Sequence, residues 1–224
     1  MGNLQIAIDG PAGAGKSTIA KKLAERLNIT YIDTGAMYRA LTYKVLKEKI
    51  EINSKDKIIK LAEDTSITLL HEDVYIDGHL VKEEIRSQEV TKHVSYVAQI
   101  PEVRKILVDL QRKIAADHSV VMDGRDIGTY VLPNAHIKVF LTASIEERAN
   151  RRYTELLQKQ QQINFTDVIN SIKERDKIDT EREFAPLVKA ADAIIIDTTG
   201  LDVEVVVEKI QQITKNKLEN QKNL

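Results

Sequence analysis

Eight residues near the start of the chain have the types and spacing needed to bind a nucleoside triphosphate. They follow the pattern G-x-x-x-x-G-K-[ST] and read Gly10-Pro11-Ala12-Gly13-Ala14-Gly15-Lys16-Ser17. The glycines let backbone N–H groups turn toward a β-phosphate, and the lysine can reach the β- and γ-phosphate oxygens. A serine hydroxyl at the last position is a suitable ligand for Mg²⁺. We therefore expect a phosphate-binding loop with a magnesium site at Ser17.

The segments on either side of this loop are those that the motif needs. Residues 4–8 form an apolar run typical of a short buried strand, and Ile19, Leu23 and Leu27 repeat at helical spacing after the loop. Such a helix directs its positive end at the bound anion. A glycine-rich turn can match four specified positions by chance, but a strand and a helix in the required order favour the phosphate loop.

The other apolar patterns predict an α/β fold. Four further runs have the length and β-branching of buried parallel strands, which brings the number of strands to five. These runs lie at residues 31–33, 120–122, 137–141 and 193–196. Helical patterns lie between the strands, and Ser144 and Glu147 are spaced as a capping box at the start of one helix.

One segment departs from the alternation of strands and helices. At residues 67–81, three short apolar runs surround a tight-turn signal at Asp77-Gly78, which predicts a small antiparallel meander. We interpret this segment as an inserted subdomain. The polar tail at 215–224 is expected to fray.

The arginines supply a second chemical signal. The chain has 11 arginines against 22 lysines, so an arginine marks a place where a planar, bidentate donor is favoured. Two groups of residues that contain arginines are spaced so that the members of each group lie on one helix face. The groups are Arg148, Arg151 and Arg152, and then Arg175 and Arg182 with Asp179. Each group could be a solvated surface with intrahelical salt bridges, but two such groups beside a phosphate loop favour phosphate binding.

Four blocks of sequence, read together, point to a known family. They are Asp9-Gly10-Pro11, Asp33-Thr34-Gly35-Ala36-Met37-Tyr38-Arg39, Asp123-Gly124-Arg125-Asp126-Ile127-Gly128-Thr129, and Glu174-Arg175-Asp176 followed by Asp179, Arg182 and Ala185-Pro186. In this order they resemble the bacterial cytidylate kinases, over residues 5 to about 200. The first block identifies only a superfamily, whereas the second and third are close to diagnostic. Ser17 stands where some relatives carry glycine, which is compatible with direct ligation of Mg²⁺.

The resemblance implies a P-loop kinase fold in a single domain, with a five-stranded parallel sheet flanked by helices. It further implies a core at about 1–50 and 100–215, an inserted subdomain for the nucleoside monophosphate at about 54–99, and a short lid at about 153–175. The predicted meander falls within this insertion. The Gln- and Lys-rich segment 158–162 lies within the lid and is typical of a mobile loop.

The implied activity is transfer of a phosphoryl group from ATP, with Mg²⁺, to CMP and also to dCMP. ATP would bind from Gly10 to Thr18, with Lys16 and the lid-side residues Arg148, Arg151 and Arg152 acting on the transferred group. Three sets of residues are implied to hold the acceptor nucleotide. They are Ser95, Arg104 and Asp126 for cytosine, Asp179 for the ribose hydroxyls, and Thr34, Arg39, Arg125, Arg175 and Arg182 for the monophosphate.

These implied roles have physical reasons. Cytosine offers an amino donor at N4 that suits the Asp126 carboxylate, and acceptors at N3 and O2 that suit Arg104. Uracil would turn a carbonyl oxygen toward that carboxylate, so UMP is disfavoured. The attacking phosphate is already anionic, so the reaction needs positioning and charge neutralisation rather than a strong general base. Asp123, after a predicted strand, could support Mg²⁺ through water.

Other classes of protein share the phosphate loop. A GTPase switch could use Asp197-Thr198-Thr199-Gly200, but the chain has no N-K-x-D segment to read guanine. A remodelling ATPase needs an acidic pair after a strand, which Met122-Asp123-Gly124 does not supply. A kinase for UMP or for a shikimate-like hydroxy acid is the stronger alternative. The many phosphate-directed arginines disfavour a hydroxyl acceptor.

Composition restricts the partners and the cellular location that we expect for the protein. With 42% hydrophobic residues among 224, the chain can bury a core, and the absence of cysteine excludes disulfides and thiolate chemistry. A net charge of −1 and no apolar run of about 20 residues argue against nucleic-acid and membrane partners. We expect a cytoplasmic protein that binds small molecules. The low aromatic content, 4%, favours a monomer.

Overall fold

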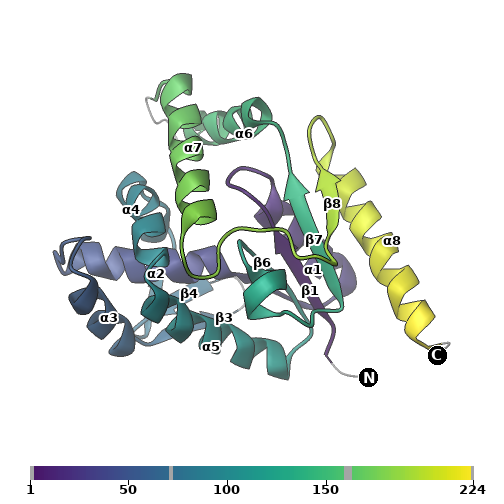
Figure 1. Cartoon of the computed structure of the whole chain (residues 1–224), viewed down its shortest axis with the longest axis horizontal. Coiled ribbons are helices and arrows are strands. Elements are labelled where there is room, and N and C mark those ends of the chain that lie inside the picture. The colour runs from purple at the N-terminus through teal and green to yellow at the C-terminus, as the bar shows by residue number, and fades with distance from the viewer. Residues whose placement is uncertain (1–2, 71–72, 159–162, 223–224) are drawn as a thin grey trace.

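The centre of the fold is a sheet of five parallel strands in the order β2-β6-β1-β7-β8. The structure is a computed structural model that describes residues 3–70, 73–158 and 163–222. The strands are β1 (Gln5–Asp9), β2 (Thr30–Asp33), β6 (Val120–Gly124), β7 (Ile137–Thr142) and β8 (Ile194–Asp197). Figure 1 shows the sheet at the centre of the molecule with helices around it. The predicted α/β fold with five parallel strands is confirmed.

Alternate side chains of β1 point into two different layers of helices. Ile6 and Ile8 pack with α1 (Lys16–Leu27) and α8 (Val203–Lys222) on one face of the sheet. Ala7 packs on the other face with α5 (Pro101–Asp117). Because both faces of this strand are buried, its sequence is a continuous apolar run rather than an alternating one.

One expectation about the C-terminal part of the chain is wrong. β8 is not a buried strand, since Ile194 and Ile195 are 40% and 56% exposed. Among the described strands it pairs only with β7, so it lies at the edge of the sheet, where a half-buried pleated surface still suits β-branched residues. The helix α8 continues to Lys222, past the start of the polar tail, and its buried residues Ile210 and Thr214 precede that tail.

The predicted meander is present as a second, three-stranded antiparallel sheet. Its strands are β3 (Ile67–Leu70), β4 (Asp73–Ile76) and β5 (His79–Val81). Asp77 and Gly78, with φ of 50° and 79°, form the tight turn between β4 and β5. Residues 71–72 lie outside the described residues, so the predicted hairpin from His71 to His79 is described only from Asp73 onward.

This small sheet shares one hydrophobic cluster with four helices that surround it. They are α2 (Thr34–Lys47), α3 (Lys55–Glu63), α4 (Gln88–Ala98) and the first half of α5, and a short 3₁₀ turn, η1 (Glu84–Arg86), leads into α4. The cluster lies to the left of the main sheet in Figure 1. It therefore gives the segment between β2 and β6 a core distinct from those on the two faces of the main sheet.

The helices α6 (Ile145–Gln158) and α7 (Phe165–Glu181) pack together through a fourth cluster, which includes Ala12 of the phosphate loop. The Ser144 hydroxyl accepts the N–H of Glu147 at 3.1 Å, as predicted, whereas the Glu147 carboxylate pairs with Arg151 instead of closing the capping box. Beyond Gln158, the predicted mobile loop lies outside the described residues. Across the described part of the chain, no helix has the length and apolar character of a membrane span.

Candidate active site

The candidate site lies along the carboxyl edge of the main sheet, where the chain leaves β1, β2 and β6. Asp9, Asp33 and Asp123 lie at the ends of these neighbouring strands. The strand register places Asp33 opposite Asp123, and Asp9 opposite Gly124. Carboxylates from three distant parts of the sequence therefore meet at one edge, which is where open α/β sheets bind their ligands.

The loop between β1 and α1 has the backbone of a phosphate-binding loop. Gly10, Gly13 and Gly15 have φ of 151°, 76° and 82°. A Cβ on Gly10 would lie 2.1 Å from the Leu141 carbonyl oxygen, so only glycine fits there. In the described part of the chain, no side chain caps the N-terminus of α1. Its first N–H groups can therefore bind the phosphates of a nucleotide.

Lys16 is buried at the start of α1, and its Nζ donates to the Pro11 carbonyl oxygen at 2.8 Å. Burial, followed by the charge of Arg125, lowers the pKa of Lys16 to about 7. An anionic ligand beside the ammonium group would raise this pKa again by favouring the charged form. The environment of Lys16 therefore fits a phosphate group.

Ser17 and Asp123 lie together, as a magnesium site at the end of the loop requires. The Ser17 hydroxyl donates to Asp123 Oδ2 at 2.9 Å, and the Tyr31 phenol donates to Oδ1 at 2.9 Å. Burial, followed by Asp33, raises the pKa of Asp123 to about 6. No cluster of three or more His, Cys, Asp or Glu with metal-binding geometry occurs among the described residues. This donor set fits Mg²⁺, which takes one or two protein ligands and completes its shell with water and phosphate oxygens.

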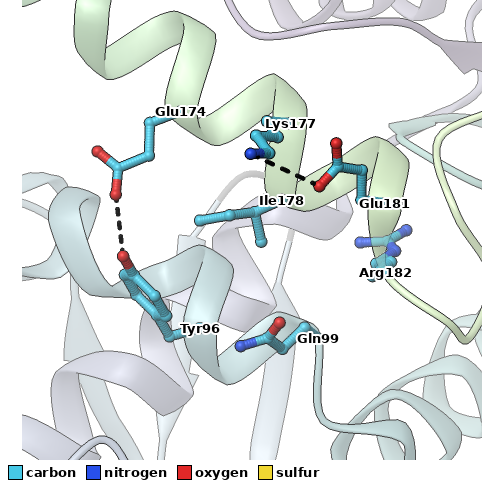
Figure 2. A pocket seen from close by; sticks show the side chains of 7 residues that line it. All are labelled: Tyr96, Gln99, Glu174, Lys177, Ile178, Glu181 and Arg182. Carbon is cyan, nitrogen blue, oxygen red and sulfur yellow. Dashed lines mark hydrogen bonds and ion pairs between the residues drawn. The ribbon is translucent and has the colours of Figure 1, made fainter.

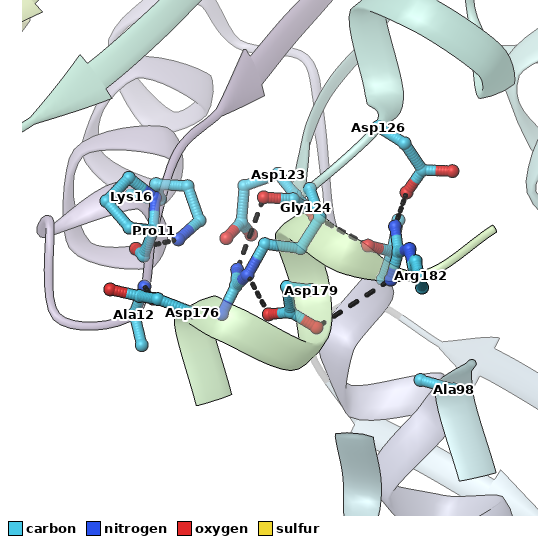
Figure 3. A network of polar contacts seen from close by, with 12 residues as sticks. Pro11, Ala12, Lys16, Ala98, Asp123, Gly124, Asp126, Asp176, Asp179 and Arg182 are labelled. Carbon is cyan, nitrogen blue, oxygen red and sulfur yellow. Dashed lines mark hydrogen bonds and ion pairs between the residues drawn. The ribbon is translucent and has the colours of Figure 1, made fainter. Parts of the chain in front are cut away.

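Three arginines surround Asp179, which lies on α7. Arg125 follows β6, Arg175 lies on α7, and Arg182 directly follows α7. Arg125 Nε donates to Asp179 Oδ2 at 2.8 Å, and Arg182 Nη1 lies 3.7 Å from Oδ1 (Figure 3). Arg175 has a buried Nε with no hydrogen-bond partner in the described structure. Burial, followed by Arg125, lowers the pKa of Arg175 to about 10. Arg182 also pairs with Asp126, which Arg104 contacts as well, so two carboxylates face four arginines. The group therefore has positive charge left for an anionic ligand.

Thr34 and Arg39 approach the same edge from α2. Thr34 Oγ1 donates to the Asp123 carbonyl oxygen at 2.7 Å, and Arg39 Nη2 donates to Asp33 Oδ2 at 2.8 Å. Asp33 also caps α2, because its Oδ1 accepts the N–H of Ala36 at 2.9 Å. The two predicted phosphate contacts therefore lie beside the ends of β2 and β6.

Asp126 lies between two buried arginines at the far end of the polar network in Figure 3. Its Oδ2 accepts from Arg104 Nη2 at 2.5 Å, and its Oδ1 accepts from Arg182 Nη2 at 3.3 Å. The Arg104 guanidinium also lies over the ring of Tyr38, at 5.2 Å from its centroid. The predicted pairing of Arg104 with Asp126 is therefore present, and it is the most buried ion pair of the site, at 1% and 5% side-chain exposure.

A cavity of about 400 Å³ opens between α4 and α7, beside this pair. Figure 2 shows its lining, which comprises Tyr96, Gln99, Glu174, Lys177, Ile178, Glu181 and Arg182. The Tyr96 phenol donates to Glu174 Oε1 at 2.9 Å across it. Ser95 is buried next to Tyr96 on the same helix. The cavity is of a size that binds small molecules and reaches Arg182, which contacts Asp126.

The comparisons with known proteins assign this arrangement to a family. A sequence model described as cytidylate kinase matches residues 6–216. The chain belongs to the cytidylate kinase family. It is 63% identical over 212 residues to the cytidylate kinase of Alkaliphilus oremlandii, covering 95% of this chain and 98% of the relative. The cytidylate kinase of Clostridioides difficile is 56% identical over 210 residues, covering 94% and 97%.

The comparison with solved structures supports the fold of this cytidylate kinase. Shikimate kinase from Bacteroides thetaiotaomicron superposes with a TM-score of 0.50 at 15% identity, covering 95% of this chain and 98% of that one. The predicted P-loop kinase fold is therefore confirmed. Membership of the cytidylate kinases decides against the GTPase and remodelling ATPase alternatives.

The three arginines that the sequence assigned to the side of a lid have different surroundings. Arg148 is buried and donates to Asp176 at 2.5 Å and to the Ala12 carbonyl oxygen at 2.9 Å. Arg151 donates to the Thr198 carbonyl oxygen at 2.7 Å, and Arg152 pairs with Glu155 within α6 at 2.8 Å. Arg148 thus contacts the phosphate loop directly. Arg151 and Arg152 both make intrahelical salt bridges, with Glu147 and Glu155, of the kind that the sequence had left as an alternative.

Three residues of this site lie outside the set that the sequence assigned to binding. Tyr31 orients Asp123, as described above, and Asp176 Oδ1 accepts the N–H of Ala12 at 3.0 Å. Asp9 accepts the N–H groups of Ile127 and Gly128 at 2.7 Å. Asp9 and Asp176 belong to the sequence blocks that carry the family resemblance, and this membership was the sequence signal that could have found them. Tyr31 had none beyond its place in a predicted strand.

Proposed function

We propose that this cytidylate kinase transfers the γ-phosphoryl group of ATP to a phosphate oxygen of CMP or dCMP, forming ADP and CDP or dCDP. The observation that carries the proposal is the polar network of Figure 3. It has two parts: the contact of Lys16 with Pro11 in the phosphate loop, and a chain of ion pairs from Arg125 through Asp179 and Arg182 to the buried Asp126. The charge of Arg125 acts on Lys16 between the two parts. Both substrates can therefore bind with their phosphates facing one another.

At the donor end, the residues Gly10 to Thr18 hold the phosphates of ATP. The Lys16 ammonium exchanges the Pro11 carbonyl for β- and γ-phosphate oxygens, and the N–H groups at the start of α1 donate to them. Ser17, with Asp123 behind it, holds Mg²⁺. The bound Mg²⁺ neutralises negative charge on the β- and γ-phosphates.

At the acceptor end, the phosphate of CMP binds among the cations around Asp179. Arg175 has unused hydrogen-bonding capacity there, and Arg125 and Arg182 each face one oxygen of Asp179. Thr34 and Arg39 complete the phosphate contacts from α2. Asp179 is the acceptor for the ribose hydroxyls. Because its carboxylate is already satisfied by arginines, loss of the 2′-hydroxyl leaves no unpaired charge, which favours acceptance of dCMP.

The base is selected by Asp126 and Arg104, with Ser95 beside them. The Asp126 carboxylate accepts from N4 of cytosine, and Arg104 donates to N3 and O2. UMP would place its O4 carbonyl against the same carboxylate. A buried acceptor facing another acceptor costs more than an imperfect fit in size, so the site discriminates by hydrogen bonding.

The residues accelerate transfer by positioning the two phosphates and by neutralising charge. The acceptor oxygen is already anionic and needs no strong base. Lys16 faces the transferred group from the loop. Arg148, Arg151 and Arg152 face it from α6, on the side of the lid at about 153–175. Closure of this lid and of the insertion at about 54–99 would exclude water and prevent hydrolysis of ATP.

The test is a coupled assay of ADP release with CMP, dCMP, UMP, AMP, GMP and shikimate as acceptors. We expect turnover of CMP and dCMP well above that of the others. Asp126→Asn should lower the preference for CMP over UMP by about tenfold or more, with a smaller change in KM for ATP. Comparable turnover of UMP by the wild type would contradict the base assignment, and a collapse of ATP affinity in the variant would show that Asp126 is misplaced.

A further inference from the structure

Asp9 is a buried carboxylate for which the proposed reaction has no direct use. It is the last residue of β1, one residue before the phosphate loop, and is 4% exposed. Its Oδ1 accepts the N–H of Ile127 and its Oδ2 accepts the N–H of Gly128, both at 2.7 Å. These two N–H groups directly follow Asp126. A single side chain therefore joins the start of the phosphate loop to the turn that carries the base-selecting carboxylate.

Close packing prevents either side of this connection from shifting alone. On the side of the phosphate loop, a Cβ on Gly10 would lie 2.1 Å from the Leu141 carbonyl oxygen. On the other side, a Cβ on Gly128 would lie 3.3 Å from Asp9 Oδ2 and 3.2 Å from Lys138 Cδ. The backbone of the turn thus lies directly on the two side chains, with no space for an inserted water.

The turn itself has an uncommon backbone that depends on this support. Residues Ile127–Val131 form one turn of π-helix, η2, in which the Asp126 carbonyl oxygen accepts the N–H of Val131 at 3.1 Å. Asp126 precedes it with φ −144° and ψ 25°, outside the regular helical region. The first N–H groups of a single helical turn have no acceptor within that turn. The Asp9 carboxylate supplies an acceptor oxygen for two of them, the N–H groups of Ile127 and Gly128. Single π-turns of this kind occur mostly at functional sites.

Asp9 must be ionised for both of its oxygens to accept. Burial raises the pKa of Asp9 to about 6, while the N–H groups of Gly128 and Ile127 oppose that rise. Asp126 on the turn and Lys16 on α1 are the charged groups that act on it, and the Lys138 stem packs beside it from β7. At neutral pH the carboxylate is therefore ionised and accepts from both N–H groups.

We propose that Asp9 is a positioning residue that holds the Asp126 carboxylate in register with the phosphate loop, and so sets the preference of the enzyme for CMP over UMP. The inference rests on the proposed function, since it assigns a cause to the selectivity of that site. Asp9 acts through Asp126 and contacts neither nucleotide.

The test is Asp9→Asn, which keeps the shape of the side chain. Asparagine retains one acceptor oxygen and turns an NH₂ group toward the other N–H, so one of the two hydrogen bonds becomes a contact between donors. Because a hydrogen bond to a charged group is lost, we expect the ratio of kcat/KM for CMP to that for UMP to fall about tenfold. KM for ATP should change by less than about twofold, since the loop keeps its own contacts.

The matched control is Asp192→Asn. It removes a carboxylate that pairs with Lys138 Nζ at 2.9 Å but keeps the hydrogen bond from Nζ to the Pro133 carbonyl oxygen, so it should leave the CMP to UMP ratio unchanged. A purely structural role for Asp9 would lower activity with both substrates and leave the ratio unchanged, and that result would overturn the proposal. If wild-type enzyme does not prefer CMP, the proposed function fails instead, whatever the variant does.

A second variant covers the case in which Asp9→Asn does not fold. Gly128→Ala keeps the carboxylate and both N–H groups but pushes a methyl group against Asp9 Oδ2 and Lys138 Cδ. Either these side chains or the turn has to give by a few tenths of an ångström. Because Asp9 Oδ2 is one of the contacted atoms, its hydrogen bond to the turn is strained, so the same ratio should fall, though by less than about tenfold. An unchanged ratio in folded Gly128→Ala would overturn the proposal in the same way.

Discussion

Arg175 should destabilise the ligand-free enzyme, and replacing it should therefore stabilise the fold while impairing the acceptor site. Its Nε is buried without a hydrogen-bond partner in the described structure, and Arg125 lies close enough to repel it. Burial and this repulsion lower the pKa of Arg175 from its usual value to about 10. For a base, a folded-state pKa below the unfolded value means that the charged form destabilises the folded state.

The size of the effect follows from that shift. A change of one unit in pKa corresponds to about 1.4 kcal/mol, so the charge on Arg175 costs the folded state roughly 3 kcal/mol. Arg175→Met keeps most of the apolar volume and removes the charge. Some favourable packing and the attraction of Asp179 are also lost, so we expect the free energy of unfolding to rise by about 1–2 kcal/mol. A lost charge-assisted bond to phosphate should weaken CMP binding by about 10- to 100-fold.

Urea unfolding of wild-type enzyme and Arg175→Met, each with and without CMP, measures both parts of this prediction. The variant should unfold at higher urea in the absence of ligand, and CMP should stabilise it much less than it stabilises the wild type. Lys173→Met is the control, since it removes an exposed cation from the same helix, α7, and should change neither quantity by more than about 0.5 kcal/mol. A variant that is less stable than the wild type, or that CMP stabilises equally, would refute the reasoning.

Two further predictions concern the donor end. With a pKa of about 7, only about a tenth of Lys16 is protonated at pH 8, and ATP phosphates should restore the charge, so ATP binding at pH 8 should take up close to one proton. Titration calorimetry in two buffers of different ionisation enthalpy measures this uptake, and Lys16→Met should abolish it; equal heats in both buffers would contradict it. Asp176→Asn should leave Arg148 without its carboxylate beside the phosphate loop, lowering the free energy of unfolding by about 1–2 kcal/mol in urea. A change below about 0.3 kcal/mol would mean that the pair is not stabilising.

Local patterns in the sequence were sufficient for most of the elements. The phosphate loop depends on residues that adjoin one another, and its glycine conformations follow from their types. The meander at 67–81 was predictable for a similar reason, because Asp77-Gly78 favours one turn and the flanking runs alternate. β8 was wrongly expected to be buried, since burial depends on which strand lies beside it. That neighbour is β7, some 50 residues earlier in the chain.

The same distinction between local sequence and tertiary structure applies to the candidate site. The sequence by itself determined which residue types are present for the chemistry: Lys16, Ser17, the arginines and the Asp126 block, all carried by short motifs. Only the tertiary structure decided how they are supported. Asp9 meets Ile127 across 118 positions, Tyr31 meets Asp123 across 92, and Asp176 meets Ala12 across 164. The first two contacts arise because parallel strands end at a common edge, and the third because α7 packs against the phosphate loop. No local pattern contains the order of the strands in the sheet or the helix that covers the loop.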